Sequence, residues 1–274
     1  MSNLVLYSIP AFLLLIALEL AWARRHPTAV GYELRDTAAS LTMGLANVVL
    51  SAATKLATIP LWAWLYQFRL IDVPLALGPW SWGVLLVAED LCYYWFHRAH
   101  HEVRVLWAVH VVHHSSRHYN LSTALRQPVL TPLTAPWFWL PLPLLGFPPA
   151  MILTAQAVSL LYQFWLHTEA VPKLGALEWV FNTPSHHRVH HGKDPQYLDR
   201  NHGGIFILWD RWFGTFTLER ERVTYGLTQD LHTFHPWRIA VHDLADMSRD
   251  VAASRSFRDV LRAIFGRPGA TKAR

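Results

Sequence analysis

The sequence contains few charged side chains and almost no cysteine. Only 16% of its 274 residues are Asp, Glu, Lys or Arg, whereas a soluble domain usually carries about 25%. The single cysteine, Cys92, excludes an intrachain disulfide and a metal site built from several thiolates. With 52% hydrophobic residues and 14 Trp, the chain is expected to be an integral membrane protein with Trp at the membrane interfaces.

Motifs of several functional classes are also absent. The chain has no G-x-S-x-G segment of a serine hydrolase and no glycine-rich fingerprint for a dinucleotide. His101-Glu102 is not followed by the second histidine of a zinc-protease helix. The net charge is +5, but no compact basic stripe stands apart from the apolar segments, so nucleic acid is not expected as a partner.

Long apolar segments recur as far as residue 166. About 20 apolar residues suffice for a helix to cross a bilayer. The sequence therefore predicts an all-α integral membrane protein with four to five transmembrane helices, over 4–23, 38–66, 80–96, 129–147 and 149–166. The turn GFPP separates the last two, which either both cross the membrane or form a re-entrant hairpin. Glu19 within the first segment is expected to have a partner in the interior or at the interface.

The arginines predict the orientation of these segments. Residues 24–37 and 97–126 contain three and four Arg, and the polar region after 167 is Arg-rich toward its end. With five spans, all three regions lie on one side, which the positive-inside bias makes cytoplasmic. We therefore expect a multi-pass protein of a bacterial inner membrane.

The chain divides into three regions. Residues 1–79 are predicted to be N-terminal membrane helices and 80–220 a histidine-rich core. Residues 221–274 contain a stretch, 238–265, with helical periodicity and with Arg and Asp among apolar residues. This pattern is typical of a helix that lies on a bilayer surface, followed here by a tail.

The 17 histidines are concentrated in a few short segments. His97 and His101 are spaced i,i+4, which places both on one face of a helix. The pattern H-x-x-H-H occurs at 110–114 and again at 187–191, and it predicts that the three histidines of each pattern share a helix face. His167 follows the fifth apolar segment. These nine imidazoles are expected to converge in a cap at the cytoplasmic ends of the helices.

This concentration of imidazole predicts bound metal. Burying nine imidazoles without partners would cost several kcal/mol, and a metal removes that cost. A single tetrahedral ion takes four ligands, so nine suit two ions of higher coordination number. Imidazole binds zinc, copper, iron and nickel alike, so the ligand type leaves the metal open.

Five segments of the chain resemble the fatty acid hydroxylase superfamily, the membrane group that includes the sterol desaturases. They are EDLCYYWFHRAHH (89–101), LWAVHVVHHSSRHYNLSTALRQ (106–127), QFWLHTE (163–169), NTPSHHRVHHG (182–192) and LDRNHGGIFILWDRWFGTF (198–216). The order of H-x3-H, H-x2-HH and H-x2-HH is highly specific. Within the group, NTPSHHRVHHG and WDRWFGTF are most similar to the alkylglycerol monooxygenase branch and its bacterial relatives.

The resemblance implies a site for two iron ions. Gln163 stands where some relatives have a further histidine, which would reduce the number of ligands, and His202 stands where tyrosine is common. The implied ligands are His97, His101, His110, His113, His114, His167, His187, His190 and His191.

Several polar residues near these histidines are candidates to support them. Metal-bound imidazole usually donates its other N–H to a carboxylate or carbonyl group. Asp90 lies seven residues before His97, on the same face of a helix. The candidates for further ligands, or for residues that hold the ligands, are His186, His202, Asp90, Asp194, Asp199 and Asn120.

The resemblance also implies a reaction. It is that of an O2-dependent, non-haem di-iron oxidoreductase, a hydroxylase, desaturase or monooxygenase. The target would be an unactivated C–H bond of a membrane lipid such as a sterol, an ether lipid or a fatty acyl chain. Two Fe2+ ions and O2 would act with an external electron donor, either a reduced pterin or cytochrome b5 or ferredoxin. Residues 80–220 would form the catalytic core, with the active site facing the cytoplasm.

The alternative is a zinc-binding membrane protein, either a transporter or a hydrolase. A transporter is expected to bind its metal near the middle of the membrane. The histidines of this chain cluster at one predicted membrane face, which favours the oxygenase.

Overall fold

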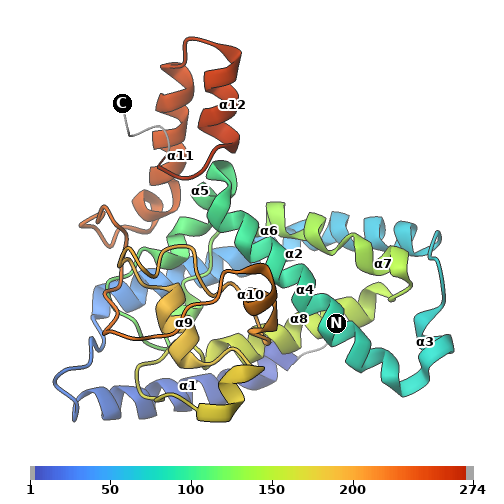
Figure 1. The fold of residues 1–274 in the computed structure, drawn as a ribbon, viewed down its shortest axis with the longest axis horizontal. Helices are drawn as coiled ribbons and strands as arrows, with labels where there is room; N and C mark the ends of the chain where they lie inside the picture. The colour runs from blue at the N-terminus through green and yellow to red at the C-terminus, as the bar shows by residue number, and fades with distance from the viewer. Residues whose placement is uncertain (1–3, 270–274) are drawn as a thin grey trace.

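Residues 4–269 are described by the computed structural model, and they form helices joined by turns and loops (Figure 1). Extended pairing among them is limited to two isolated antiparallel bridges, Phe181 with Phe206 and Gly192 with Tyr225. The predicted all-α class is therefore confirmed. The α-helices are α1 (Leu4–Ala23), α2 (Leu34–Tyr66), α3 (Val73–Leu77), α4 (Ser81–Glu102), α5 (Arg104–His114), α6 (Thr131–Thr134), α7 (Pro141–Leu145), α8 (Pro149–Phe164), α9 (Pro184–His190), α10 (Leu208–Phe213), α11 (Pro236–Ala252) and α12 (Phe257–Phe265), and the 3₁₀ turns are η1 (Gly78–Trp80), η2 (Thr123–Leu125), η3 (Ala135–Trp139) and η4 (Gly175–Trp179).

α1 and α2 are the two helices of the described residues that are long and apolar enough to cross a membrane. Only 6% of the apolar window of each is buried inside the protein, whereas the core helix of a soluble protein would be mostly buried. They coincide with the first two predicted spans, except that α2 begins at Leu34. Two such helices do not confirm the predicted four to five.

The predicted fourth segment is not one helix. Its residues form three short pieces, α6, η3 and α7. Proline residues at 132, 136, 141 and 143 interrupt the backbone hydrogen bonding that a continuous helix needs. Gly146, with a φ of 108°, ends α7 at the predicted GFPP turn. The 16 residues of α8 are fewer than the roughly 20 that cross a bilayer without help.

α4 lies in the apolar core and leads into the histidines. It contains the predicted third segment and continues without a break to Glu102. Leu85 and Phe96 of α4 pack with Trp62 of α2, Trp139 of η3 and Ile152 of α8. Because three elements hold α4, its last turn, which carries His97 and His101, points in a fixed direction.

Glu19 of α1 is buried and accepts three hydrogen bonds. The donors are the backbone N–H of Leu121, at 2.7 Å, and the hydroxyls of Tyr32 and Thr168. The predicted partner of Glu19 is therefore found in the interior. Because Leu121 follows the second histidine cluster and Thr168 follows His167, Glu19 ties α1 to both of these loops.

A buried ion pair ties α2 to the loop after α5. Arg126 is 1% exposed and donates to the Asp36 carboxylate, to Ser40 Oγ at 3.2 Å and to Ser115 Oγ at 3.1 Å. The other carboxylate oxygen of Asp36 accepts from Ser116 Oγ at 2.6 Å. A buried charge is tolerated when it is paired and hydrogen-bonded in this way. The loop therefore keeps one position relative to α2.

The C-terminal region is a helical hairpin, and the prediction of a single surface helix over 238–265 is wrong. α11 ends at Ala252, and Ser256 begins α12 by accepting a hydrogen bond from the Asp259 N–H at 3.1 Å. Serine at this position caps a new helix. The hairpin packs against α5 and projects from the body of the molecule (Figure 1). The end of the predicted tail, 270–274, lies outside the described residues.

From the burial of the Asp36–Arg126 pair we predict that its loss lowers the free energy of unfolding. Arg126→Ala should destabilise the protein by about 3 to 5 kcal/mol, because it leaves a carboxylate buried without its cation. Asp36→Ala/Arg126→Ala should lose less than the sum of the two single variants. Thermal unfolding of detergent-purified protein measures these effects. The control is Arg69→Ala, which breaks the partly exposed Arg69–Asp72 pair and should cost less than about 1 kcal/mol. Equal losses in both Arg variants would contradict the structural role of Arg126.

Candidate metal centre

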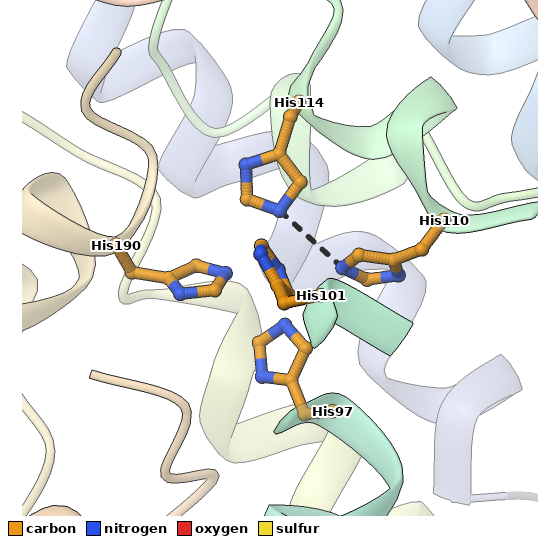
Figure 2. A group of neighbouring side chains, drawn as sticks. All are labelled: His97, His101, His110, His114 and His190. Carbon is orange, nitrogen blue, oxygen red and sulfur yellow. Dashed lines mark hydrogen bonds between the residues drawn. The ribbon is translucent and has the colours of Figure 1, made fainter. Parts of the chain in front are cut away.

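Nine buried histidines gather in one place, which we term the histidine cage. They form two groups, and within each group the potential ligand nitrogens lie within 4.8 Å of one another. In the first group the rings of His97, His110, His114 and His190 lie around that of His101 in the view of Figure 2. The five-histidine group contains His97, His101, His110, His114 and His190, and the four-histidine group contains His113, His167, His187 and His191. The structure thus brings together all nine of the predicted ligands.

Three pairs spaced i,i+4 supply six of the nine histidines. His97 and His101 lie on α4, and the pair 110 and 114 lies on α5. The pair 187 and 191 lies on α9 and its C-terminal cap. Residues one helical turn apart point the same way, so each pair stays within one group. The remaining three, His113, His167 and His190, complete the two groups.

Each H-x-x-H-H pattern is divided between the two groups. Its three histidines all enter the cage from one side of their helix, but they serve two centres and not one. Adjacent residues lie about 100° apart around a helix, and the doublets 113–114 and 190–191 therefore send one ring to each group. The ring centroids within these doublets are 5.4 and 5.3 Å apart. His114 and His191 stack across the boundary at 4.4 Å, so the two groups are direct neighbours.

Backbone carbonyl groups determine which ring nitrogen carries the proton in four of the rings. A carbonyl oxygen can only accept, so the Nδ1 that contacts it must donate, and Nε2 of the neutral ring then has a free lone pair. The four contacts are His97 Nδ1 with His202 O at 2.9 Å, His190 Nδ1 with Arg200 O at 2.9 Å, His113 Nδ1 with Arg126 O at 3.2 Å and His167 Nδ1 with Gln163 O at 3.0 Å.

Within the four-histidine group these lone pairs face one another. Nε2 of His167 lies 3.1 Å from Nε2 of His113 and 2.9 Å from Nε2 of His187. Nε2 of His187 lies 3.2 Å from Nε2 of His191. Since His113 and His167 both donate through Nδ1, their two facing Nε2 atoms are both acceptors and form no hydrogen bond. A cation placed among these atoms turns the repulsion into attraction, so this donor set fits a metal ion.

The five-histidine group also contains buried nitrogen atoms that lack a partner. Nε2 of His97, His101 and His190 are buried without a hydrogen-bond partner. Unsatisfied buried polar atoms are rare in folded proteins and require an explanation. A metal ion that accepts all three lone pairs would explain why these atoms lack hydrogen bonds. The residues present therefore fit a second ion.

Burial keeps these imidazoles in the form that binds metal. Removal from water lowers the pKa of all nine, that of His113 to about 4. For His97 and His101, the neighbouring His190 lowers the pKa further. Metals bind neutral imidazole, so at neutral pH the cage requires no proton release before binding.

The loop 199–206 orients two ligands of the five-histidine group through the carbonyls of Arg200 and His202. Asp210 holds this loop by accepting from the backbone N–H groups of His202 and Gly203, both at 2.7 Å. Gly203 is required by the close packing, because a Cβ there would lie 2.4 Å from Phe206 O. Asp210 thus positions His97 without touching it.

Asp90 acts on the same loop. Its carboxylate accepts from the N–H groups of Ile205 at 2.6 Å and Phe206 at 3.0 Å, and from Trp209 Nε1 at 2.8 Å. The predicted direct support of His97 by Asp90 is therefore corrected, since all of these bonds go to the loop and to α10. Asp90 joins α4 to the segment whose carbonyls orient the ligands.

The other predicted supporting residues differ in their distance from the cage. Asp199 Oδ1 lies 3.6 Å from His101 Nδ1 and is therefore beside a ligand. Asp194 accepts from the Thr224 N–H at 2.8 Å, on the surface. Asn120 donates to Gly31 O at 2.7 Å and accepts from Ser122. These bonds give Asp194 and Asn120 roles in loop structure.

The remaining candidates, His202 and His186, lie outside both groups. The ring of His202 is 5.0 Å from that of His101, and its Nε2 contacts Asp199 O at 3.2 Å. His186 is buried 3.9 Å from Glu178 Oε2. The two groups thus contain the nine histidines that the resemblance implied and neither of these two.

Two neighbouring residues clarify the limits of the cage. His100, which lacks the i,i+4 spacing from His97 that His101 has, places Nδ1 2.7 Å from Phe96 O and Nε2 2.9 Å from Thr134 Oγ1, so both nitrogens have partners outside the cage. Gln163 supports His167 through its carbonyl, while its side chain donates to Ser159 Oγ at 3.0 Å. The supporting carbonyls have no signal in the sequence, since every residue has one.

Comparison with known proteins gives consistent results. A family model described as fatty acid hydroxylase matches residues 82–215. Alkylglycerol monooxygenase of Xenopus tropicalis is 39% identical over 258 residues, which cover 94% of this chain and 57% of that protein. The Homo sapiens protein of the same name is 40% identical over 261 residues, covering 95% and 58%. Ornithine lipid hydroxylase OlsE of Rhizobium tropici is 33% identical over 132 residues, covering 48% and 40%.

No solved structure matches the chain. The chain spans a little more than half the length of these alkylglycerol monooxygenases. The segment matched by the family model, 82–215, contains all nine histidines of the cage. In this segment, the chain is similar to the fatty acid hydroxylase family.

Proposed function

We propose that this protein is an O2-dependent monooxygenase of a membrane lipid, with a pair of iron ions in the histidine cage. The observation that carries the proposal is the convergence of nine buried imidazoles in two adjacent groups, with free lone pairs turned inward. The names of the alkylglycerol monooxygenase relatives favour an ether-linked glycerolipid as substrate.

In this proposal each group of histidines holds one ion. The ligands are neutral, so the two metal ions would keep more positive charge than they would in a site rich in carboxylates. When bound, the iron pair supplies the reduction of O2 and the removal of hydrogen from a C–H bond. Overall, one oxygen atom enters the C–H bond and the other becomes water, with two electrons and two protons from an external donor. On the carbon beside an ether oxygen, the product is a hemiacetal, which breaks down to an aldehyde and an alcohol.

The protein contributes position and exclusion of water. Carbonyls at 126, 163, 200 and 202 hold four rings with Nε2 turned inward. Burial of all nine rings keeps bulk water from the reacting centre. An apolar groove of about 510 Å³ lies along α4, lined by residues such as Val84, Leu91 and Trp209, and its surface suits a hydrocarbon chain.

We place α1 and α2 across the membrane, with the cage beside the end where α1 stops and α2 starts. Glu19, near that end of α1, accepts a hydrogen bond from Thr168, the neighbour of His167. Arg24, Arg25 and Arg35 lie in the connection between the two helices. The positive-inside bias therefore assigns the cage to the cytoplasmic face.

The function is tested by metal content and turnover together. Protein purified in detergent and loaded with Fe2+ should bind about two irons per chain and consume O2 with an alkylglycerol, releasing an aldehyde. Reduced pterin, cytochrome b5 and ferredoxin serve as alternative donors. His110→Ala and His187→Ala should each retain about one iron and lose turnover, because each opens one group. His100→Gln is the control and should keep both irons. A full iron complement in both ligand variants, or turnover without O2, would reject the proposal, and zinc as the native metal would favour the alternative.

A second prediction for metal content concerns the loop 199–206, which orients His97 and His190. Asp210→Asn replaces one acceptor oxygen by an amide that faces backbone N–H donors, so the loop should shift and misalign His97 and His190. About one iron per chain should remain, in the four-histidine group, as in His110→Ala. Asp194→Asn is the matched control, since that carboxylate accepts from Thr224 at the surface. Loss of both irons or of neither in Asp210→Asn would contradict a role confined to one group.

The pH dependence of stability follows from the lowered pKa of the cage histidines. In metal-free protein, the pKa of His113 falls from 6.5 to about 4, and that of the other eight also falls. Between these pH values the unfolded chain binds more protons, so the free energy of unfolding decreases as pH falls from 6.5 towards 4. Burial also raises the pKa of several carboxyls outside the membrane-spanning segments, that of Asp90 and Asp210 to about 6 and that of Glu89 to about 8, and this acts in the opposite direction. These carboxyls are fewer than the nine histidines, so the histidines determine the direction of the change. Chelator-treated protein should therefore unfold at a lower temperature at pH 5.5 than at pH 7.5, and an equal or higher midpoint at pH 5.5 would be inconsistent with a buried neutral cage.

A further inference from the structure

The hairpin of α11 and α12 projects sideways from the protein. In Figure 1 its two helices run across the direction of α1 and α2. α12 is the helix of the hairpin that lies on the side of the C-terminal end of α2. If α1 and α2 cross a membrane, the hairpin therefore runs along the membrane surface. The Arg104 N–H donates to Gly266 O at 2.9 Å and so joins the end of α12 to the start of α5.

α12 exposes a stripe of large apolar side chains. Phe257, Leu261 and Phe265 are 76%, 41% and 60% exposed. Their i, i+4, i+8 spacing places them on one face of the helix. The inward face is marked by Ala263, which is 1% exposed. This nine-residue helix thus leaves its three largest apolar groups in contact with the surroundings.

Positive charge borders this stripe. Arg258 and Arg262 each follow a stripe residue in the sequence and are exposed, so they form a parallel row about 100° around the helix. Arg255 and Arg267 are exposed beyond the two ends of α12. The hairpin has four acidic residues, and each has a partner. Asp243 and Asp250 contact the buried Arg104 at 3.5 and 3.2 Å, Asp246 pairs with Arg249, and Asp259 of α12 accepts from Ser256 Oγ at 2.8 Å at the start of the helix.

We propose that α12 docks on the anionic lipid surface of the membrane leaflet beside the cage. The apolar stripe inserts at the boundary of headgroups and acyl chains, and the Arg row meets the lipid phosphates. Amphipathic helices with a basic border bind membranes in this way. The charge of the row favours anionic lipid, and the crosswise direction of the hairpin presents α12 to a membrane that contains α1 and α2.

This contact fixes the height of the cage above the membrane. α5 carries His110, His113 and His114, and it packs against both α11 and α12. Ile239 of α11 is buried with Val112 of α5. A hairpin held on the lipid surface therefore holds α5, and with it three of the nine cage histidines, at a constant depth.

The proposal is tested by measuring the depth of α12 in a bilayer. The full chain, in a Cys92→Ala background, carries a spin label at Leu261→Cys and is reconstituted in nanodiscs of phosphatidylglycerol or phosphatidylcholine. Collision with O2, which concentrates in lipid, is compared with collision with a water-soluble nickel chelate. Ser248→Cys on the exposed side of α11 is the control.

The Leu261 label should show an O2-to-nickel accessibility ratio several-fold above that of the Ser248 label, with the larger difference in phosphatidylglycerol. Arg258→Gln/Arg262→Gln should remove the dependence on anionic lipid. Equal ratios at the two positions would overturn the proposal, since α12 would then lie in water. Protection of the Leu261 label from both reagents would also overturn it, because a second copy or another protein would then cover the stripe. The measurement involves neither metal nor turnover, so its result is independent of the proposed oxidation.

Discussion

The structure depends on keeping nine neutral imidazoles buried around two centres, with the free Nε2 lone pairs of His97, His113, His167 and His190 turned inward. Such an arrangement is unfavourable by itself, because neighbouring acceptors repel and unsatisfied polar atoms lose their hydration. His113 and His167 show the constraint most directly, since both donate outward to carbonyls and face each other at 3.1 Å. The rest of the fold has to hold these rings in place until a cation relieves the repulsion.

Buried carboxylates one layer further out provide that restraint. Asp36 holds Arg126, whose carbonyl orients His113. Asp90 and Asp210 hold the loop whose carbonyls orient His97 and His190. In each case an ionic or backbone hydrogen bond fixes a main-chain segment, and the segment then fixes a ligand. Four buried charged residues of this charge-poor chain, Asp36, Asp90, Arg126 and Asp210, thus lie where a small backbone shift would misalign a ring.

In the proposed membrane placement, the position of the cage relative to the lipid follows from the same connections. Glu19 joins α1 to the loops beside the second cluster and beside His167. α5 lies between α4 and the C-terminal hairpin, so both the apolar core and the projecting helices hold its three histidines. The proposed lipid substrate would have to meet the cage at a defined depth, and these contacts hold the cage at one position relative to α1 and α2.

The sequence by itself determined the helical class and the two N-terminal apolar helices, because apolar length acts locally along a helix. It also indicated the nine cage histidines, six of them through i,i+4 spacing and the other three through the H-x-x-H-H patterns and the family resemblance. The tertiary structure decided how those histidines divide into five and four. The doublets 113–114 and 190–191 straddle two centres, and only the packing of α4, α5 and α9 shows which ring faces which neighbour. It also decided that Asp90 acts through a loop and that the 129–147 segment is broken. The orienting carbonyls had no signature in the sequence, since every residue carries one and only the fold selects which of them meets a ring.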